Sequence, residues 1–168
     1  MIILLVFIVI QRLLELVLAK RNERSLKAKG AVEFGKRHYP LMIALHAGFF
    51  LSLAAEWLTG AGELHAYSAV LLVAFFLLQF IRVWILYSLG DHWNTKVLVI
   101  PGAPLIKRGP YKYWLKHPNY VVVMAEMFVL VLLFQAYFTG VVFLLFKLLF
   151  LTYIRIPLEE QALRWSRE

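Results

Sequence analysis

Long apolar stretches separated by shorter polar ones run along the chain, and they predict an all-α integral membrane protein. A membrane helix needs about 20 mostly apolar residues to cross a hydrocarbon core of roughly 30 Å. The pattern predicts a single membrane domain over residues 1–168 that contains five transmembrane helices. The five predicted spans are approximately residues 1–19, 40–58, 67–87, 120–135 and 140–154.

The last apolar stretch is too long to be a single span. From Tyr120 to Tyr153 the chain is predominantly apolar for 34 residues, and one helix of that length would measure roughly 50 Å. Because this exceeds the thickness of a bilayer, we expect a helical hairpin with its turn at residues 135–140. The polar segment 155–168 then follows, and Pro157 predicts the first turn of a short C-terminal helix.

Polar residues inside the predicted spans indicate contacts between helices. Arg12 and Glu15 are three residues apart in the first span, so they can form a structural pair on one helix face or border a polar cavity. His46 lies among apolar residues, which favours a hydrogen bond to a neighbouring helix over a role as a ligand. Gln79 and Arg82 lie near the end of the third span, where arginine can extend to the membrane surface.

Lysines and arginines are concentrated in alternate connections. Seven lie in residues 20–37 and five in residues 89–119, whereas the connections after the second and fourth spans have none. The positive-inside rule therefore predicts a multi-pass protein, of the cell membrane, with its N-terminus outside and its C-terminus and central loop in the cytoplasm. A net charge of +8 would suggest nucleic acid in a soluble chain. Here we expect anionic membrane lipids as partners and no nucleic acid.

Composition narrows the chemistry further. Hydrophobic residues make up 62% of the chain, well above the roughly 45–50% of soluble proteins. The chain has no cysteine, which excludes disulfides, thiolate metal sites and a cysteine nucleophile. No HExxH motif, phosphate-binding glycine loop or clustered histidine pair is present, so the sequence supports neither a metal site nor a metalloprotease or NTPase activity.

The longest polar interruption, residues 89–119, carries the side chains best suited to a polar site. It contains Gly109-Pro110-Tyr111 and ends in His117-Pro118-Asn119-Tyr120 at the entry to the predicted hairpin. At the hairpin exit, Arg155 is followed by the paired carboxylates Glu159 and Glu160. Since both segments flank one hairpin, we expect them to line one cavity at the cytoplasmic surface. Taken singly, the aromatic residues also suit a membrane-interface belt and the charges suit helix ends.

Together, these three motifs resemble those of the isoprenylcysteine carboxyl methyltransferase family. The family pattern is roughly Gly-Pro-Tyr, Arg-His-Pro-x-Tyr and Arg-x-x-x-Glu-Glu across a helical hairpin, and the resemblance covers residues 89–163. It implies an S-adenosylmethionine-dependent O-methyltransferase that forms a methyl ester or ether on a carboxylate or acidic hydroxyl. In the best-known branch the acceptor is a prenylated cysteine carboxylate. The compact chain favours a lipophilic small molecule, isoprenoid or long-alkyl.

The resemblance also implies roles for individual residues. Arg155 matches the arginine that faces the methyl acceptor, and an anionic acceptor needs no general base; a neutral hydroxyl would require Glu160 or His117 to take a proton. Lys116 stands where arginine is usual, and one additional residue separates Tyr111 from His117, so Tyr111 and Tyr113 are both candidates for the family's tyrosine. The implied cofactor-binding residues are Leu105, Ile106, Tyr111, Tyr113, His117, Pro118, Asn119, Tyr120 and Glu159.

Two other classes of function remain as alternatives. A non-enzymatic membrane scaffold or assembly protein would bind anionic lipid through its basic loops and pair its intramembrane polar residues with another subunit. It predicts that Arg155 and Glu159 can be replaced with an effect on stability alone. A transporter or haem protein is disfavoured, because the spans show no internal repeat and His46 and His117 are predicted at different depths.

Overall fold

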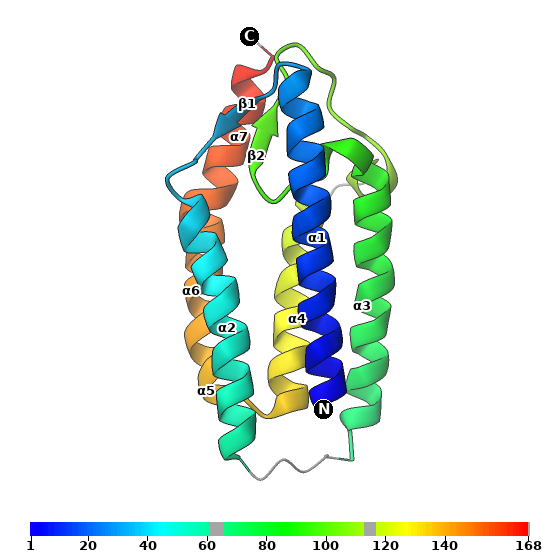
Figure 1. Cartoon of the computed structure of the whole chain (residues 1–168), viewed down its shortest axis with the longest axis vertical. Helices are drawn as coiled ribbons and strands as arrows, with labels where there is room; N and C mark the ends of the chain where they lie inside the picture. The colour runs from blue at the N-terminus through cyan, green and yellow to red at the C-terminus, as the bar shows by residue number, and fades with distance from the viewer. Residues whose placement is uncertain (61–65, 113–116, 168) are drawn as a thin grey trace.

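The computed structural model describes residues 1–60, 66–112 and 117–167 as a helical bundle with one small sheet at one end (Figure 1). Within these ranges, four helical segments are long and apolar enough to cross a membrane. A shorter apolar helix, α4, lies between them (Figure 1). The predicted all-α membrane fold is confirmed. The long segments are α1 (Ile2–Ala28), α2 (Tyr39–Thr59), α3 (Ser68–Leu89) with the 3-10 turn η1 (Gly90–His92), and a helical run from Tyr137 to Trp165.

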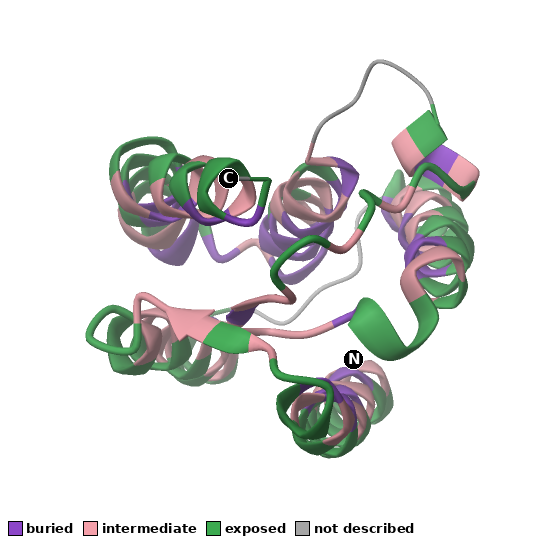
Figure 2. Cartoon of the chain, turned by 90° about the horizontal axis from the view of Figure 1, so that it is seen from above, coloured by how far each residue is buried: buried purple, intermediate pink, exposed green. Residues whose placement is uncertain are grey.

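Large apolar side chains cover the outside of the bundle. Leu51 and Phe80 are each 73% exposed, and seen from above the exposed residues of the long helices lie mostly on their outer faces (Figure 2). In water such an extensive apolar surface would favour association, whereas lipid tails solvate it. The distribution of exposed apolar residues therefore matches a protein embedded in a bilayer.

Helix α4 (Pro118–Phe134) forms the centre of the bundle. Its inner side chains, including Met127 and Leu130, pack with Ile8 of α1, Phe49 of α2 and Phe75 of α3 in one buried cluster. With 17 residues, the helix is roughly 25 Å long. Helix α4 therefore begins at Pro118 as a buried element of the bundle.

The predicted hairpin is present, and its turn is shorter than expected. Gln135 adopts a left-handed conformation with φ of 57°, and the backbone N–H of Ala136 donates to the carbonyl of Val131 at 3.0 Å. The next helix then begins at Tyr137. The carboxylate of Glu56 on α2 accepts hydrogen bonds from the N–H groups of Phe138 and Thr139 at 3.0 and 2.9 Å. This contact supplies partners for N–H groups that a helix start leaves free.

The helical run after the hairpin turn contains two π-helical turns. The second, η4, ends at Arg155, two residues before Pro157. Proline interrupts the hydrogen-bond ladder of an α-helix, and a π-helical turn relaxes that ladder locally. The predicted C-terminal helix is therefore observed as a continuation of the membrane helix. The successive elements are α5 (Tyr137–Thr139), η3 (Gly140–Leu144), α6 (Leu145–Phe150), η4 (Leu151–Arg155) and α7 (Ile156–Trp165).

Much of the basic segment 20–37 forms helix or strand, which the sequence pattern did not predict. Helix α1 continues to Ala28, and strand β1 (Val32–Phe34) pairs antiparallel with β2 (Val97–Val99), with Glu33 opposite Leu98. Glu23 accepts hydrogen bonds from Lys27 at 2.5 Å and Lys96 at 2.8 Å. Hydrogen bonding to Glu23 raises the pKa of Lys96. Charge pairing between α1 and the loop of β2 thus allows a segment rich in lysine and arginine to fold.

Candidate active site

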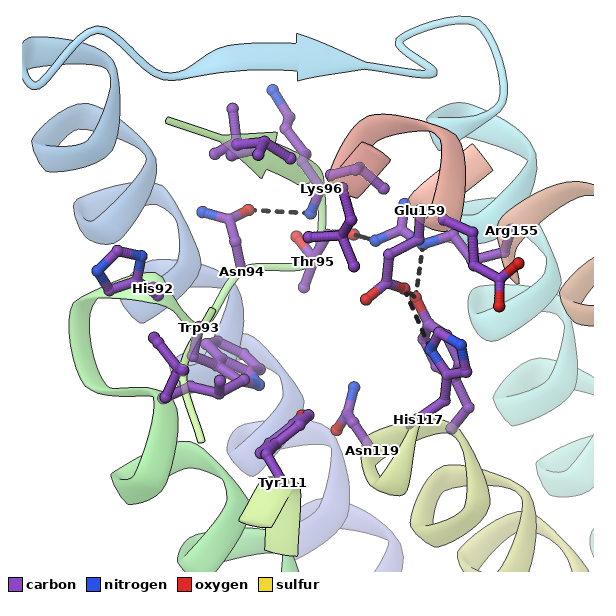
Figure 3. Close-up of a pocket in the computed structure, with 18 of the residues that line it drawn as sticks. His92, Trp93, Asn94, Thr95, Lys96, Tyr111, His117, Asn119, Arg155 and Glu159 are labelled. Atoms are coloured by element: carbon purple, nitrogen blue, oxygen red, sulfur yellow. Dashed lines mark hydrogen bonds and ion pairs between the residues drawn. The ribbon is translucent and has the colours of Figure 1, made fainter. Parts of the chain in front are cut away.

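A cavity of about 610 Å³ lies at the end of the bundle that carries the small sheet (Figure 3). The loop after α3, strand β2, the 3-10 turn η2 (Gly109–Lys112), the start of α4 and helix α7 contribute its walls. Its volume is within the roughly 300–1,000 Å³ range of pockets for small molecules and cofactors. The residues that line the cavity come from distant parts of the chain, from Met42 to Arg167.

The two segments on either side of the hairpin meet in this cavity. Nδ1 of His117 lies 3.7 Å from Oε2 of Glu159, and the hydroxyl of Tyr120 donates a short hydrogen bond to the same carboxylate. Nε of Arg155 donates to the Tyr120 hydroxyl at 3.0 Å. Figure 3 shows Arg155 and Glu159 facing His117 across the cavity. The predicted convergence of the two segments is therefore present.

Several buried polar atoms around the cavity have no hydrogen-bond partner within the described ranges. They are Nε1 of Trp93, both ring nitrogens of His117 and Oδ1 of Asn119. A buried donor or acceptor without a partner costs about 1–3 kcal/mol, and most such atoms in folded proteins are paired. Donors and acceptors left unpaired in one cavity indicate a polar ligand that pairs with them.

Contacts with helix α1 and with Arg155 of η4 hold the loop between α3 and β2 over the cavity. Nδ2 of Asn22 on α1 donates to the carbonyl of Trp93 at 2.8 Å, and Nδ2 of Asn94 donates to a carbonyl of α1 at 2.8 Å. Nη2 of Arg155 donates to the carbonyl of Thr95 at 2.8 Å. Asn94 therefore packs the loop against α1. Arg155 joins the same loop to Tyr120, which is hydrogen-bonded to Glu159.

Tyr111 lies on the opposite wall from His117 (Figure 3). Burial raises the pKa of its phenol, and the negative charge of Glu159 adds to the effect. Tyr111 therefore stays protonated at neutral pH and can donate one hydrogen bond while its ring covers the cavity wall.

We expect Gly109→Ala to disrupt the cavity. Gly109 has φ of +53°, and a Cβ there would lie 1.9 Å from Oγ and 2.8 Å from Cβ of Ser88. Gly102→Ala is a matched control, since Gly102 has φ of +72° with nothing within 4 Å of its Cβ position. Both variants meet the left-handed backbone penalty of about 1 kcal/mol, but Gly109→Ala adds the steric clash. Thermal unfolding in detergent should show a clearly larger loss for Gly109→Ala; equal losses would contradict the packing of η2 against α3.

The structure brings most of the predicted site residues together. Pro118 differs from the others: it is buried as the first residue of α4 and does not line the cavity. Tyr113 lies outside the described residues, so the alternative between Tyr111 and Tyr113 stays open, although Tyr111 does line the cavity. The predicted residues that line the cavity are Leu105, Ile106, Tyr111, His117, Asn119, Tyr120, Arg155, Glu159 and Glu160.

Residues that the motifs did not assign to the site also line the cavity. Trp93, Thr95 and Lys96 belong to the loop after α3, and His46 and Lys147 lie in the membrane-spanning part of α2 and α6. Lys147 and Glu126 are charged residues inside the predominantly apolar stretch 120–153. A charge in a membrane helix is costly and usually faces the protein interior, so both were detectable signals of an internal polar contact.

Charged side chains of α1, α3 and α4 form a buried network next to the cavity. Glu15 and Glu126 are each bonded to both Arg12 and Arg82, at 2.5 to 3.3 Å. Gln79 donates to Glu126 at 3.1 Å and accepts from the Gln11 amide at 2.7 Å. The charges of the two arginines and the two glutamates in this network therefore cancel inside the bundle. The expectation that Arg82 extends to the membrane surface is wrong, because its guanidinium is buried against these carboxylates.

Comparisons with known proteins place the chain near one family and two uncharacterized relatives. A family model described as the isoprenylcysteine carboxyl methyltransferase (ICMT) family matches residues 69–165. The uncharacterized protein YpbQ of Bacillus subtilis is 44% identical over 161 residues, which cover 96% of this chain and 95% of YpbQ. An uncharacterized protein of Haemophilus influenzae is 29% identical over 153 residues, 90% of this chain and 88% of its own length. No solved structure matches the chain significantly.

Proposed function

The chain belongs to the isoprenylcysteine carboxyl methyltransferase family of membrane methyltransferases, and we propose that it methylates an oxygen atom of a lipophilic acceptor with S-adenosylmethionine. The observation that carries this proposal is the meeting of Glu159 with His117 and Tyr120 in one cavity that holds unpaired polar atoms. The product is a methyl ester if the acceptor is a carboxylate and a methyl ether if it is an acidic hydroxyl.

The cavity residues suit the chemical groups of S-adenosylmethionine. The Glu159 carboxylate can accept hydrogen bonds from the two ribose hydroxyls, and the free ring nitrogens of His117 with Oδ1 of Asn119 can pair with the amino-acid end. Tyr111 and the apolar residues at positions 105–106 cover the adenine. When bound, the cofactor supplies an electrophilic methyl group on a positively charged sulfur. These assignments match buried polar atoms of the cavity that have no hydrogen-bond partner among the described residues.

Arg155 is proposed to act in two ways. Through its bonds to Tyr120 and the Thr95 carbonyl it positions Glu159 and the loop after α3. Its guanidinium also keeps a positive charge at the cavity wall, which favours an acceptor that carries an anionic oxygen. An anionic acceptor becomes neutral on methylation and needs no proton acceptor. For a neutral hydroxyl, Glu160, which also lines the cavity, is the residue placed to accept a proton.

The charge of the cavity walls supports an anionic acceptor. Among the described residues, seven lysines and arginines line the cavity against the two glutamates Glu159 and Glu160. The sulfonium of the methyl donor adds a further positive charge. An acceptor with an anionic head and an apolar chain would offset these charges and partition into the surrounding lipid. A lipophilic small molecule of isoprenoid or long-alkyl type fits, and a prenylated carboxylate has the same chemistry.

The proposed orientation places the cavity at the cytoplasmic surface. Residues 20–37, the central loop and α7, which carry most of the lysines and arginines, lie at the cavity end of the bundle, and the N-terminus lies at the other end (Figure 1). The positive-inside rule assigns the basic end to the cytoplasm. S-adenosylmethionine is made in that compartment, so the cavity would be open to its supply.

The proposal is tested by binding and by methyl transfer. Detergent-purified protein should bind radiolabelled S-adenosylhomocysteine saturably. Membranes that contain the protein should transfer label from the methyl group of S-adenosylmethionine to an organic-extractable product, and an alkaline wash should release that label if it is a methyl ester. Folded protein that shows no saturable binding would overturn the proposal and favour a membrane scaffold that binds anionic lipid.

A further inference from the structure

Lys147 is a buried cation for which the described residues offer no carboxylate. It is 2% exposed, whereas its neighbours Phe146 and Leu148 are 56% and 52% exposed. The lysine therefore points into the bundle and the neighbours point to lipid. Its ammonium lies 3.1 Å from Nδ1 of His46 and 6.0 Å from the ring centroid of Phe150. Neither contact supplies the negative charge that a buried ammonium normally requires.

The contact with His46 satisfies Lys147 only in part. Nδ1 of His46 is also 3.1 Å from the carbonyl oxygen of Met42. One ring nitrogen either carries a proton and donates to the carbonyl or is bare and accepts from the lysine, so both bonds cannot form together. An ammonium has three N–H donors, and at most one of them has an acceptor here. At least two donors are left free at the wall of the cavity that Lys147 and His46 line.

The other buried or paired cations of the cavity already have partners. Arg82 is bonded to Glu15 and Glu126. Lys96 lies 2.8 Å from Glu23 and 3.4 Å from Glu33, and Arg155 donates to a hydroxyl and a carbonyl. Among the lining cations that the structure describes within the membrane helices, Lys147 therefore has the fewest partners, since Arg82 is bonded to two carboxylates and Arg155 to a hydroxyl and a carbonyl.

Lys147 lies on the same helix face as Arg155, deeper in the membrane. Lys147, Leu151 and Arg155 are four residues apart in turn, all three are buried, and all three line the cavity. Residues four apart stay on one helix face in the π-helical turn η4, because a π-helix has more than four residues per turn. Eight residues correspond to roughly 12 Å along the helix axis. The cavity therefore extends from the residues assigned to the cofactor down to a cation at membrane depth.

We propose that Lys147, oriented by His46, binds the anionic oxygen head group of the methyl acceptor at the membrane end of the cavity. This inference rests on the proposed function and specifies its acceptor as an amphiphile that enters as an anion. Apolar side chains that line the same cavity, Met42, Val123 and Leu151, suit the chain of such a molecule. A bound anion would supply the charge that the protein itself does not place next to Lys147.

The test uses decanoate as an anionic probe and decanol as its neutral counterpart. Decanoate should raise the unfolding temperature of the wild type in detergent, with and without S-adenosylhomocysteine, and decanol should raise it much less. Lys147→Met should weaken the apparent decanoate affinity by about 30-fold, the value expected for a hydrogen-bonded ion contact. Lys147→Arg keeps the charge and should lose less than about tenfold. Lys36→Met, which removes an exposed lysine that does not line the cavity, should have little effect.

A second measurement links the probe to the acceptor. Lys147→Met should bind S-adenosylhomocysteine like the wild type and transfer much less labelled methyl to the organic extract of membranes. Normal transfer by Lys147→Met, or equal stabilisation of wild type and variant by decanoate, would overturn the inference while leaving cofactor binding intact. If Lys147→Arg is as inactive as Lys147→Met although it still binds decanoate, the inference is also wrong, because the lysine then acts as a neutral base. Loss of S-adenosylhomocysteine binding in the wild type would instead refute the proposed function.

Discussion

Glu159→Ala should weaken the binding of S-adenosylhomocysteine by about 100-fold. The carboxylate is proposed to accept hydrogen bonds from both ribose hydroxyls, and a hydrogen bond to a charged group contributes about 1.5–3 kcal/mol. Two bonds at the lower value amount to about 3 kcal/mol, which corresponds to roughly 100-fold in the dissociation constant. Equilibrium binding of radiolabelled ligand to the detergent-purified variant measures the effect directly.

Two further variants separate this role from a structural one. Glu160→Ala removes the adjacent carboxylate of the same helix and should leave the ligand affinity within about threefold, because no contact with the diol is proposed for it. Tyr120→Phe removes the hydroxyl that donates to Glu159 and accepts from Arg155, and it keeps the carboxylate. Since this bond only positions Glu159, the expected loss is less than about tenfold. A Glu159→Ala protein that is folded and binds the ligand normally would refute the assignment.

The sequence predicted that the two polar segments meet, because short motifs lie on either side of one apolar stretch. His117 and Glu159 are 42 positions apart in the chain, but the length of the intervening apolar stretch requires a hairpin. A hairpin returns the chain to the side from which it left, so the two residues had to emerge at one surface. The structure confirms that consequence with the contact between His117 and Glu159.

The parts that the sequence did not predict depend on contacts between distant helices. The spacing of Arg12 and Glu15 indicated a local pair, which is observed at 3.0 Å. No local pattern indicated that Arg12 also binds Glu126, 114 residues later, or that Lys147 faces His46. Likewise, the extension of α1 to Ala28 depends partly on Glu23, whose partner Lys96 belongs to a distant loop. Charge balance inside a bundle depends on how the helices pack. The sequence therefore indicates which buried charges need an ion-pair partner, but it does not identify that partner.

Glu126→Gln should destabilise the protein more than any other substitution proposed for the membrane helices. Glu126 is 1% exposed and accepts hydrogen bonds from Arg12, Arg82 and Gln79. Glutamine has nearly the same shape but no charge, so the variant leaves the buried Arg82 and the partly buried Arg12 with one carboxylate, Glu15. Removing one partner of a buried ion pair costs about 3–5 kcal/mol, which for a chain of this size lowers the unfolding temperature by roughly 6–20 °C. Heating in detergent with tryptophan fluorescence or size-exclusion detection measures the shift.

A double variant tests whether the cost comes from unbalanced charge. Arg12→Gln combined with Glu126→Gln restores the charge balance, because one cation, Arg82, remains bonded to one carboxylate, Glu15. The double variant should therefore be more stable than the sum of the two single losses predicts, by about 1–2 kcal/mol. Gln79→Leu removes a neutral member of the network and should cost less than Glu126→Gln. Glu126 does not line the cavity, so the folded fraction of each variant should bind S-adenosylhomocysteine normally. Strictly additive losses would show that the carboxylate stabilises the bundle through packing, and that charge balance does not govern the network.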